Sequence, residues 1–186
     1  MKNFLRDSLI TLTIAVVILF GLQVTFQKFA VDGPSMNPNF HNRQILLVNK
    51  VVYKFHEPER GDVIIFHPPG NRQGDYIKRI IGLPGESVEI KEGIVYIHKE
   101  DGSVLSLDEP YITEPAGDAF PIVKIPENEY FVLGDNRNNS SDSRNGWTLP
   151  CQNIIGKAWL SIWRPEWWGL AANYSFQEQI DNSMNK

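Results

Sequence analysis

The stretch of residues 8–27 carries no charged side chain, and it limits the possible folds of this chain more than any other feature. As a helix, these 20 residues would be about 30 Å long, which matches the hydrocarbon core of a bilayer. A cleaved secretory signal is one alternative, but Gln27-Lys28-Phe29-Ala30 offers no small-x-small cleavage site. A buried core helix is another, but this stretch is apolar all round. The sequence therefore predicts one transmembrane helix at residues 8–27.

Basic residues before this helix set its expected orientation. Lys2 and Arg6 precede it, and positively charged flanks stay on the cytoplasmic side of a membrane. We therefore expect residues 1–7 in the cytoplasm. Everything from Lys28 onward is then expected on the other side, in a periplasmic, extracytoplasmic or lumenal space.

The composition beyond the helix is that of a globular domain. The chain is 42% hydrophobic and 22% charged, which argues against disorder. Its net charge is −4 and its Lys and Arg residues do not cluster, so a nucleic-acid partner is not expected. Cys151 is the single cysteine, so cysteine usage does not indicate the redox compartment. We expect a monomer.

Short runs of strand-forming residues, separated by Gly and Pro, predict a mainly β fold for residues 28–176. The apolar run at residues 62–66 reads as a strand buried on both faces. Residues 88–125 contain three alternating runs joined by Gly-containing connectors, which predict an inserted β-hairpin region. We expect a mainly antiparallel sheet, followed by a flexible tail at residues 177–186.

Ser35 and Lys78 are the candidate reactive pair. Ser35 lies in the turn Gly33-Pro34-Ser35-Met36, eight residues past the apolar stretch, and Lys78 lies in a strand-like run. A serine hydroxyl becomes a good nucleophile only when a neighbouring base takes its proton. A lysine can be that base when burial suppresses its charge, whereas Arg79 stays protonated. Taken singly, each has an ordinary interpretation, as a turn serine and an exposed lysine.

The polar loop at residues 134–144 directly follows an apolar strand. A calcium loop needs oxygen ligands at alternating positions, but Arg137 stands third from Asp135. We therefore expect no metal and no cofactor there. The many short polar side chains indicate instead a hydrogen-bonded network that lines a site.

Four sequence motifs resemble the ordered boxes of type I signal peptidases, and they occur in the family's order after an apolar helix. They are Ser35-Met36-x-Pro38, Arg60-Gly61-Asp62-Val63, residues 78–85 (KRIIGLPG), and residues 134–144 (GDNRNNSSDSR). Several motifs in order are far more specific than one. The resemblance implies a membrane-bound serine endopeptidase with a Ser/Lys dyad, which acts on preprotein signal peptides at the lipid bilayer and cleaves after small residues in an Ala-x-Ala-like pattern.

Position by position, the resemblance implies Ser35 as nucleophile and Lys78 as general base. Ser140 would hydrogen-bond the Lys78 amine, and the backbone N–H of Ser35 would donate to the oxyanion. Asp142 and Arg144 would form an ion pair, and with Asp135 and Arg137 they would shape the loop.

The chain departs from the family pattern at three positions. Gly33 stands where some members have a serine that assists the oxyanion, Asn39 follows Pro38 where threonine is common, and Asn138 replaces a frequent aspartate. We expect the dyad to tolerate all three changes.

Two further expectations concern surfaces. The apolar strand Val63-Ile64-Ile65-Phe66 is predicted to pair with an extended substrate and to form shallow pockets. The adjacent Trp167 and Trp168 are predicted to touch the lipid interface, where indoles are favoured.

Two rival functions are a self-cleaving Ser/Lys regulator and a catalytically silent, membrane-anchored domain that only binds peptides. The first would need a DNA-binding or partner module in place of the N-terminal helix, and the presence of both Ser35 and Lys78 argues against the second.

Overall fold

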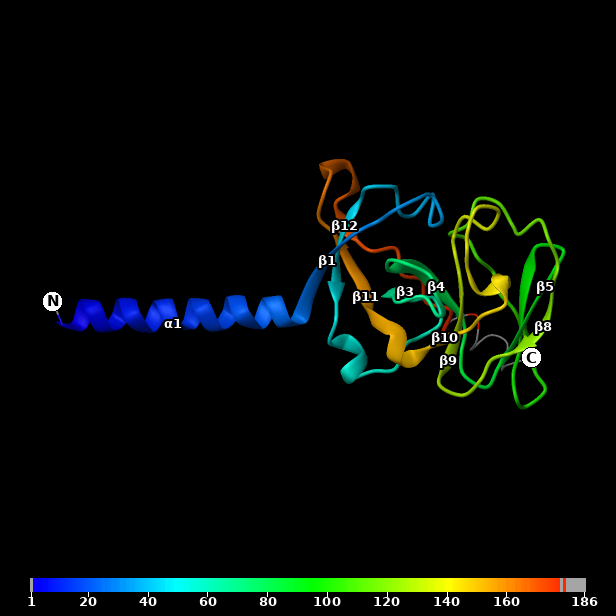
Figure 1. The fold of residues 1–186 in the computed structure, drawn as a ribbon, viewed down its shortest axis with the longest axis horizontal. Helices are drawn as coiled ribbons and strands as arrows, with labels where there is room; N and C mark the ends of the chain where they lie inside the picture. Colours follow the sequence, from blue (N-terminus) through cyan, green and yellow to red (C-terminus); the bar gives the residue numbers. More distant parts are fainter. Residues whose placement is uncertain (1, 178, 180–186) are drawn as a thin grey trace.

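In the computed structural model, which describes residues 2–177 and 179, a long N-terminal helix leads into a β domain. Helix α1 (Lys2–Thr25) projects from this domain as an isolated rod (Figure 1). Its segment Phe4–Thr25 has a mean hydropathy of 2.2 and contacts no core, so its length and composition suffice to cross a membrane. The helix ends before residue 27 because Phe26 and Gln27 already pair with strand β2. Residues 178 and 180–186 of the predicted tail lie outside the described residues.

The first sheet has eight strands in the order β1-β2-β11-β3-β4-β9-β10, with β12 paired to β11. All of its pairings are antiparallel. Its strands are β1 (Phe26–Ala30), β2 (Ile45–Asn49), β3 (Val63–Phe66), β4 (Tyr76–Gly82), β9 (Glu129–Leu133), β10 (Leu149–Pro150), β11 (Ile154–Ser161) and β12 (Gly169–Leu170). Four short 3-10 turns connect them: η1 (Val52–Lys54), η2 (Ser143–Asn145), η3 (Cys151–Asn153) and η4 (Pro165–Trp167).

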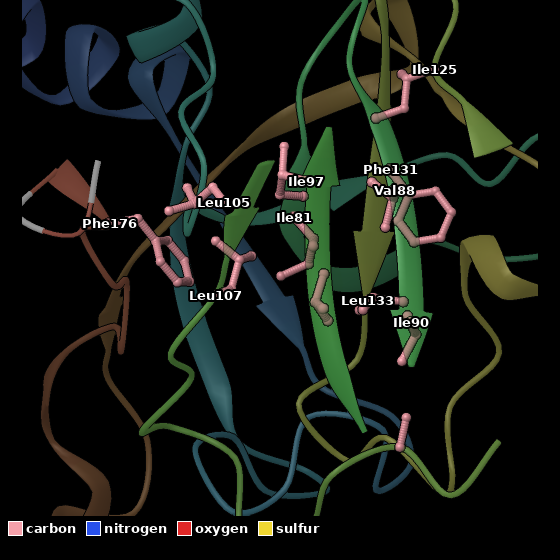
Figure 2. Packing of buried hydrophobic residues seen from close by; sticks show 12 residues of the cluster. Ile81, Val88, Ile90, Ile97, Leu105, Leu107, Ile125, Phe131, Leu133 and Phe176 are labelled. Carbon is pink, nitrogen blue, oxygen red and sulfur yellow. The ribbon is translucent and has the colours of Figure 1, made fainter. Parts of the chain in front are cut away.

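The second sheet has four antiparallel strands in the order β7-β6-β5-β8. It is built from β5 (Ser87–Lys91), β6 (Ile94–His98), β7 (Val104–Ser106) and β8 (Phe120–Lys124), which together form one continuous insertion between β4 and β9. Its apolar face meets the end of β4 and strand β9 (Figure 2), where Val88, Ile90 and Ile97 pack with Ile81 and Phe131 in one buried cluster. The prediction of a mainly antiparallel β fold after one apolar helix is confirmed.

This architecture brings three segments together at one place. Strand β4 lies in the middle of the first sheet, β9 runs beside it, and the loop at residues 134–144 begins where β9 ends. The turn that carries Ser35 begins after β1. Two hydrogen bonds join the ends of the segment that contains it, from Val31 N–H to the Gln44 carbonyl (2.8 Å) and from Arg43 N–H to the Val31 carbonyl (2.8 Å).

Candidate active site

Lys78 lies on strand β4, at the edge of a cavity. Its side chain is 3% exposed. The Nζ atom is hydrogen-bonded to Ser35 Oγ at 2.7 Å and to the carbonyl oxygen of Ile77 at 2.8 Å. Burial lowers the pKa of Lys78 to about 8, against the opposing effect of the Asp142 and Asp135 charges, which raise it. An amine with this pKa is partly neutral near physiological pH, so it can accept a proton.

Ser35 is half-buried in a turn that presents its hydroxyl to this amine. Gly33 opens the turn with a φ of +80°, and a Cβ at this position would meet no atom within 4 Å. Space therefore allows a side chain at position 33, but the left-handed backbone favours glycine.

A cavity of about 290 Å³ adjoins both residues. Its walls come from β1, the Ser35 turn, the segment before β4, β4 itself and the loop at residues 134–144: Phe29, Asp32, Ser35, Gln73, Gly74, Asp75, Tyr76, Ile77, Lys78 and Ser141. Strand β9 pairs with β4 only from Arg79 onward. Within residues 2–177 and 179, no strand therefore pairs with the edge of β4 opposite β3 at residues 76–78, beside the cavity, and this edge can accept an extended chain.

Buried ion pairs hold the loop at residues 134–144. Asp142 accepts two hydrogen bonds from Arg144 at 2.8 Å each and one from Gly134 N–H at 3.1 Å. Asp135 receives a bidentate pair from Arg79, at 2.9 and 2.7 Å, with both side chains fully buried. Such planar, doubly bonded pairs fix orientation strongly. The loop is therefore rigid where it meets the Ser35 turn.

Arg137 is itself buried within this loop. Its guanidinium group binds Glu109 through two contacts of 2.6 Å and donates to the Gly134 carbonyl at 3.0 Å. Glu109 belongs to the connection between β7 and β8. This pair thus ties the second sheet's connector to the loop.

Comparisons with known proteins identify the family of this chain. The family model described as "Signal peptidase, peptidase S26" matches residues 3–163. The chain is 39% identical to the Probable signal peptidase I-1 of Synechocystis sp., over 94% of this chain and 90% of that protein. It is 41% identical to Signal peptidase I S of Bacillus subtilis, over 74% of this chain and 77% of that protein. A crystal structure of a signal peptidase I from Enterococcus faecalis aligns with 55% of this chain and 97% of its own, at 34% identity and a TM-score of 0.47.

The chain belongs to the signal peptidase family, peptidase S26. It is accordingly a hydrolase, a serine endopeptidase. The family assignment rests on the match of the family model and on the curated relatives.

Strand β3 does not have the place in this signal peptidase fold that its apolar sequence suggested. Val63, Ile64, Ile65 and Phe66 are all buried, and β3 is paired on one edge with β11 and on the other with β4. It has no free edge for a substrate strand. The prediction that β3 pairs with substrate is corrected: the open edge beside the cavity belongs to β4.

Ser140 is placed near the dyad, but its expected hydrogen bond is not formed. The Ser140 hydroxyl is buried and has no hydrogen-bond partner within residues 2–177 and 179. A Cβ on Gly134 would collide with both Ser140 Oγ and the Ser35 carbonyl oxygen. These two oxygens therefore both lie against the Gly134 backbone, where only glycine fits.

Three residues of this family member's site had no structural role assigned to them from the sequence. Arg79 and Glu109 are the partners of Asp135 and Arg137, and Asn39 donates 2.8 Å hydrogen bonds to both Asp135 Oδ2 and the Tyr111 carbonyl. The signal for Arg79 was its position in a run covered on both faces, where a cation requires a partner. Asn39, one of the departures from the family pattern, thus joins the Ser35 turn to the loop.

Proposed function

We propose that this enzyme removes N-terminal signal peptides from exported preproteins by Ser35/Lys78 chemistry and cleaves after small residues in an Ala-x-Ala-like pattern. The observation that carries the proposal is the 2.7 Å contact between a buried Lys78 amine, with a pKa of about 8, and the Ser35 hydroxyl. The names of the curated relatives support the substrate class.

The neutral Lys78 amine takes the Ser35 proton as Oγ attacks the carbonyl carbon of the scissile peptide bond. The resulting oxyanion is held by the backbone N–H of Ser35, which has no other partner among the described residues. Lys78 then gives its proton to the leaving amine and the C–N bond breaks. Water, deprotonated by the neutral amine, hydrolyses the acyl-enzyme and frees Ser35.

Ser140 has a place in this cycle after Ser35 is acylated. Lys78 then loses the Ser35 hydroxyl as a partner, and the unpartnered Ser140 hydroxyl is available to orient the amine. Its position against the Gly134 backbone, beside the Ser35 carbonyl, supports this role.

The extended substrate pairs with the open edge of β4 at residues 76–78 and places its side chains in the adjoining cavity. Main-chain pairing supplies affinity that depends little on sequence, and pockets supply selectivity. Walls too close for larger side chains favour small residues next to the scissile bond.

The anchor and the exposed aromatic residues support cleavage at a bilayer surface. Lys50 N–H bonds the Thr25 carbonyl at 2.9 Å, so the β domain begins where the helix ends. Trp159, Trp163, Trp168 and Leu170 are 44–77% exposed on or next to β11 and β12, and Phe26 stacks on Trp159 at 4.9 Å beside the helix end. With Lys2 and Arg6 on the cytoplasmic side, the domain lies on the trans side as a single-pass monomer.

The test uses the full chain in proteoliposomes and a preprotein with an Ala-x-Ala site. Ser35→Ala, Lys78→Ala and Lys78→Arg should each lower turnover by at least about 10³-fold, because arginine cannot accept a proton. Ser106→Ala and Lys124→Ala, two exposed positions on the second sheet, are the matched controls. Wild-type turnover by any of the three dyad variants would refute the assignment.

A further inference from the structure

The peptide bond between Pro34 and Ser35 has its two polar groups in different situations. The Pro34 carbonyl accepts two hydrogen bonds, from Asn37 N–H at 3.0 Å and from the Asn136 Nδ2 amide at 3.2 Å. The N–H of Ser35, on the other side of the same peptide, has no partner in the part of the chain that the structure describes. The carbonyl of this peptide is therefore fixed by hydrogen bonds, and its N–H is available to bind a ligand.

Because the peptide unit is rigid, hydrogen bonds that fix the Pro34 carbonyl also fix the direction of the Ser35 N–H. The unit is planar and trans, so its C=O and N–H point in opposite directions. Fixing the Pro34 oxygen therefore fixes the direction of the Ser35 N–H. Hydrogen bonds to the carbonyl also polarise the peptide and strengthen its N–H as a donor, an effect of about 10–30% per bond.

We propose that the Asn136 side chain is a positioning residue that aims and strengthens the Ser35 N–H as the oxyanion donor. This inference rests on the proposed function, in which Ser35 is the nucleophile. Asn136 does not touch the reacting atoms; it acts through the Pro34 carbonyl.

The position of Asn136 is restrained by its own backbone and by its neighbour in the chain. Its backbone N–H donates to the Ser35 carbonyl at 3.0 Å, so it bonds both carbonyls of the Pro34-Ser35 pair. The preceding Asp135 is fixed by its buried pair with Arg79. The amide must present nitrogen to Pro34, because the flipped orientation would set two acceptors face to face.

The residue at position 33 makes the oxyanion depend more strongly on the Ser35 N–H. Gly33 has no side chain that could donate to the oxyanion, and its φ of +80° disfavours replacement by a serine. Loss of one oxyanion donor typically costs about 10²–10³-fold in rate. A misdirected donor should cost a fraction of that.

The experiment compares two substitutions at one position. Asn136→Ala removes the amide, and we expect kcat and kcat/KM to fall about tenfold, with KM within about twofold, as for an interaction made only in the transition state. Asn136→Asp keeps the shape but replaces the donor by an acceptor that repels the Pro34 oxygen, so its loss should be larger. Asn138→Ala is the matched control, because this exposed amide on the same loop bonds the connector at residues 114–117.

A peptide aldehyde ending in Ala-x-Ala distinguishes a misdirected Ser35 N–H from a general loosening of the site structure. Ser35 Oγ adds to the aldehyde carbon, its proton passes to Lys78, and the new oxyanion occupies the donor site. The aldehyde should bind Asn136→Ala more weakly by the same factor as kcat/KM falls, while affinity for the cleaved product peptide and the acid limb of the pH–rate profile stay unchanged.

Wild-type kcat/KM in Asn136→Ala, a loss confined to KM, or an Asp variant as active as wild type would each overturn the inference. None of these results touches the proposed function, which fails only if Ser35→Ala or a Lys78 variant stays active.

Discussion

Lys78 and Arg79 are neighbours on strand β4, yet the environments on the two faces of the strand have opposite effects on their positive charges. Both side chains are buried, at 3% and 0% exposure. Arg79 has a carboxylate, Asp135, bound through two hydrogen bonds, and two further acceptors in the carbonyls of Gly61 and Ala172. Among the residues that the structure describes, the hydrogen-bond partners of the Lys78 amine are two uncharged oxygens, those of Ser35 and Ile77.

The difference shows that burial alone does not make a cation reactive. A buried cation with a bidentate carboxylate keeps its charge and becomes part of the framework. A buried amine without an ion-pair partner lowers its pKa instead and becomes a base. The two faces are also linked, because the Asp135 that neutralises Arg79 is one of the charges that raise the pKa of Lys78.

The largest effect is expected from removing the carboxylate on the Arg79 side. Asp135→Ala leaves a buried guanidinium without its anion, which should cost about 3–5 kcal/mol of folding free energy. The thermal unfolding midpoint should then fall by roughly 6–20 °C in detergent micelles, followed by tryptophan fluorescence.

A control replaces a carboxylate that is not part of a buried pair. Asp101→Ala, on an exposed turn, should change the midpoint little. If Asp135→Ala unfolds within about 2 °C of wild type, Arg79 does not depend on its carboxylate and the contrast between the two faces fails.

The next effect concerns the Lys78 face and is a pH dependence. Because the proposed chemistry needs the neutral amine and the pKa of Lys78 is about 8, the rate should fall about tenfold per pH unit below pH 8 and level off above it. The rate at pH 6 should be about 100-fold below the plateau. Single-turnover cleavage of a preprotein from pH 5.5 to 9.5 measures this limb. A midpoint near 10 would mean that the amine is hydrated like that of an ordinary lysine.

The same strand shows how much of the site could be predicted from the sequence. The resemblance of four ordered motifs to type I signal peptidases implied that Ser35 and Lys78 share one site, and the run at residues 76–81 predicted the strand that holds Lys78. The apolar run at residues 62–66 predicted a strand buried on both faces, which β3 is. The prediction that β3 pairs with substrate was wrong, because the order of strands in the sheet decides which strand has a free edge, and β3 lies between β11 and β4.

The ion pair of Asp142 with Arg144 was expected from the family resemblance and is present, but the pairs of Arg79 and Arg137 could not be predicted, for a related reason. Arg79 and Asp135 are separated by 56 positions, and Arg137 and Glu109 by 28, and no local period joins them. Their meeting depends on the pairing of β4 with β9 and on the path of the connector before β8. The role of Asn39 was equally hidden, because it is defined by two partners on distant segments.

The smallest effect is a gain in stability at the expense of catalysis. The Lys78 pKa in the folded state, about 8, lies below its ordinary 10.5, so the folded protein disfavours the charged amine. This penalty, roughly 3 kcal/mol, is fully present below pH 8 and disappears as the pH rises through 10.5. Lys78→Met removes the charge but also loses two hydrogen bonds worth about 1 kcal/mol each. We therefore expect an inactive protein that is more stable by about 1 kcal/mol at pH 7, with the gain lost by pH 10. Chemical unfolding at both pH values measures it, with the exposed Lys91→Met as the unchanged control. Equal destabilisation by Lys78→Met at both pH values would show that the amine is as well stabilised in the folded state as Arg79 is by Asp135.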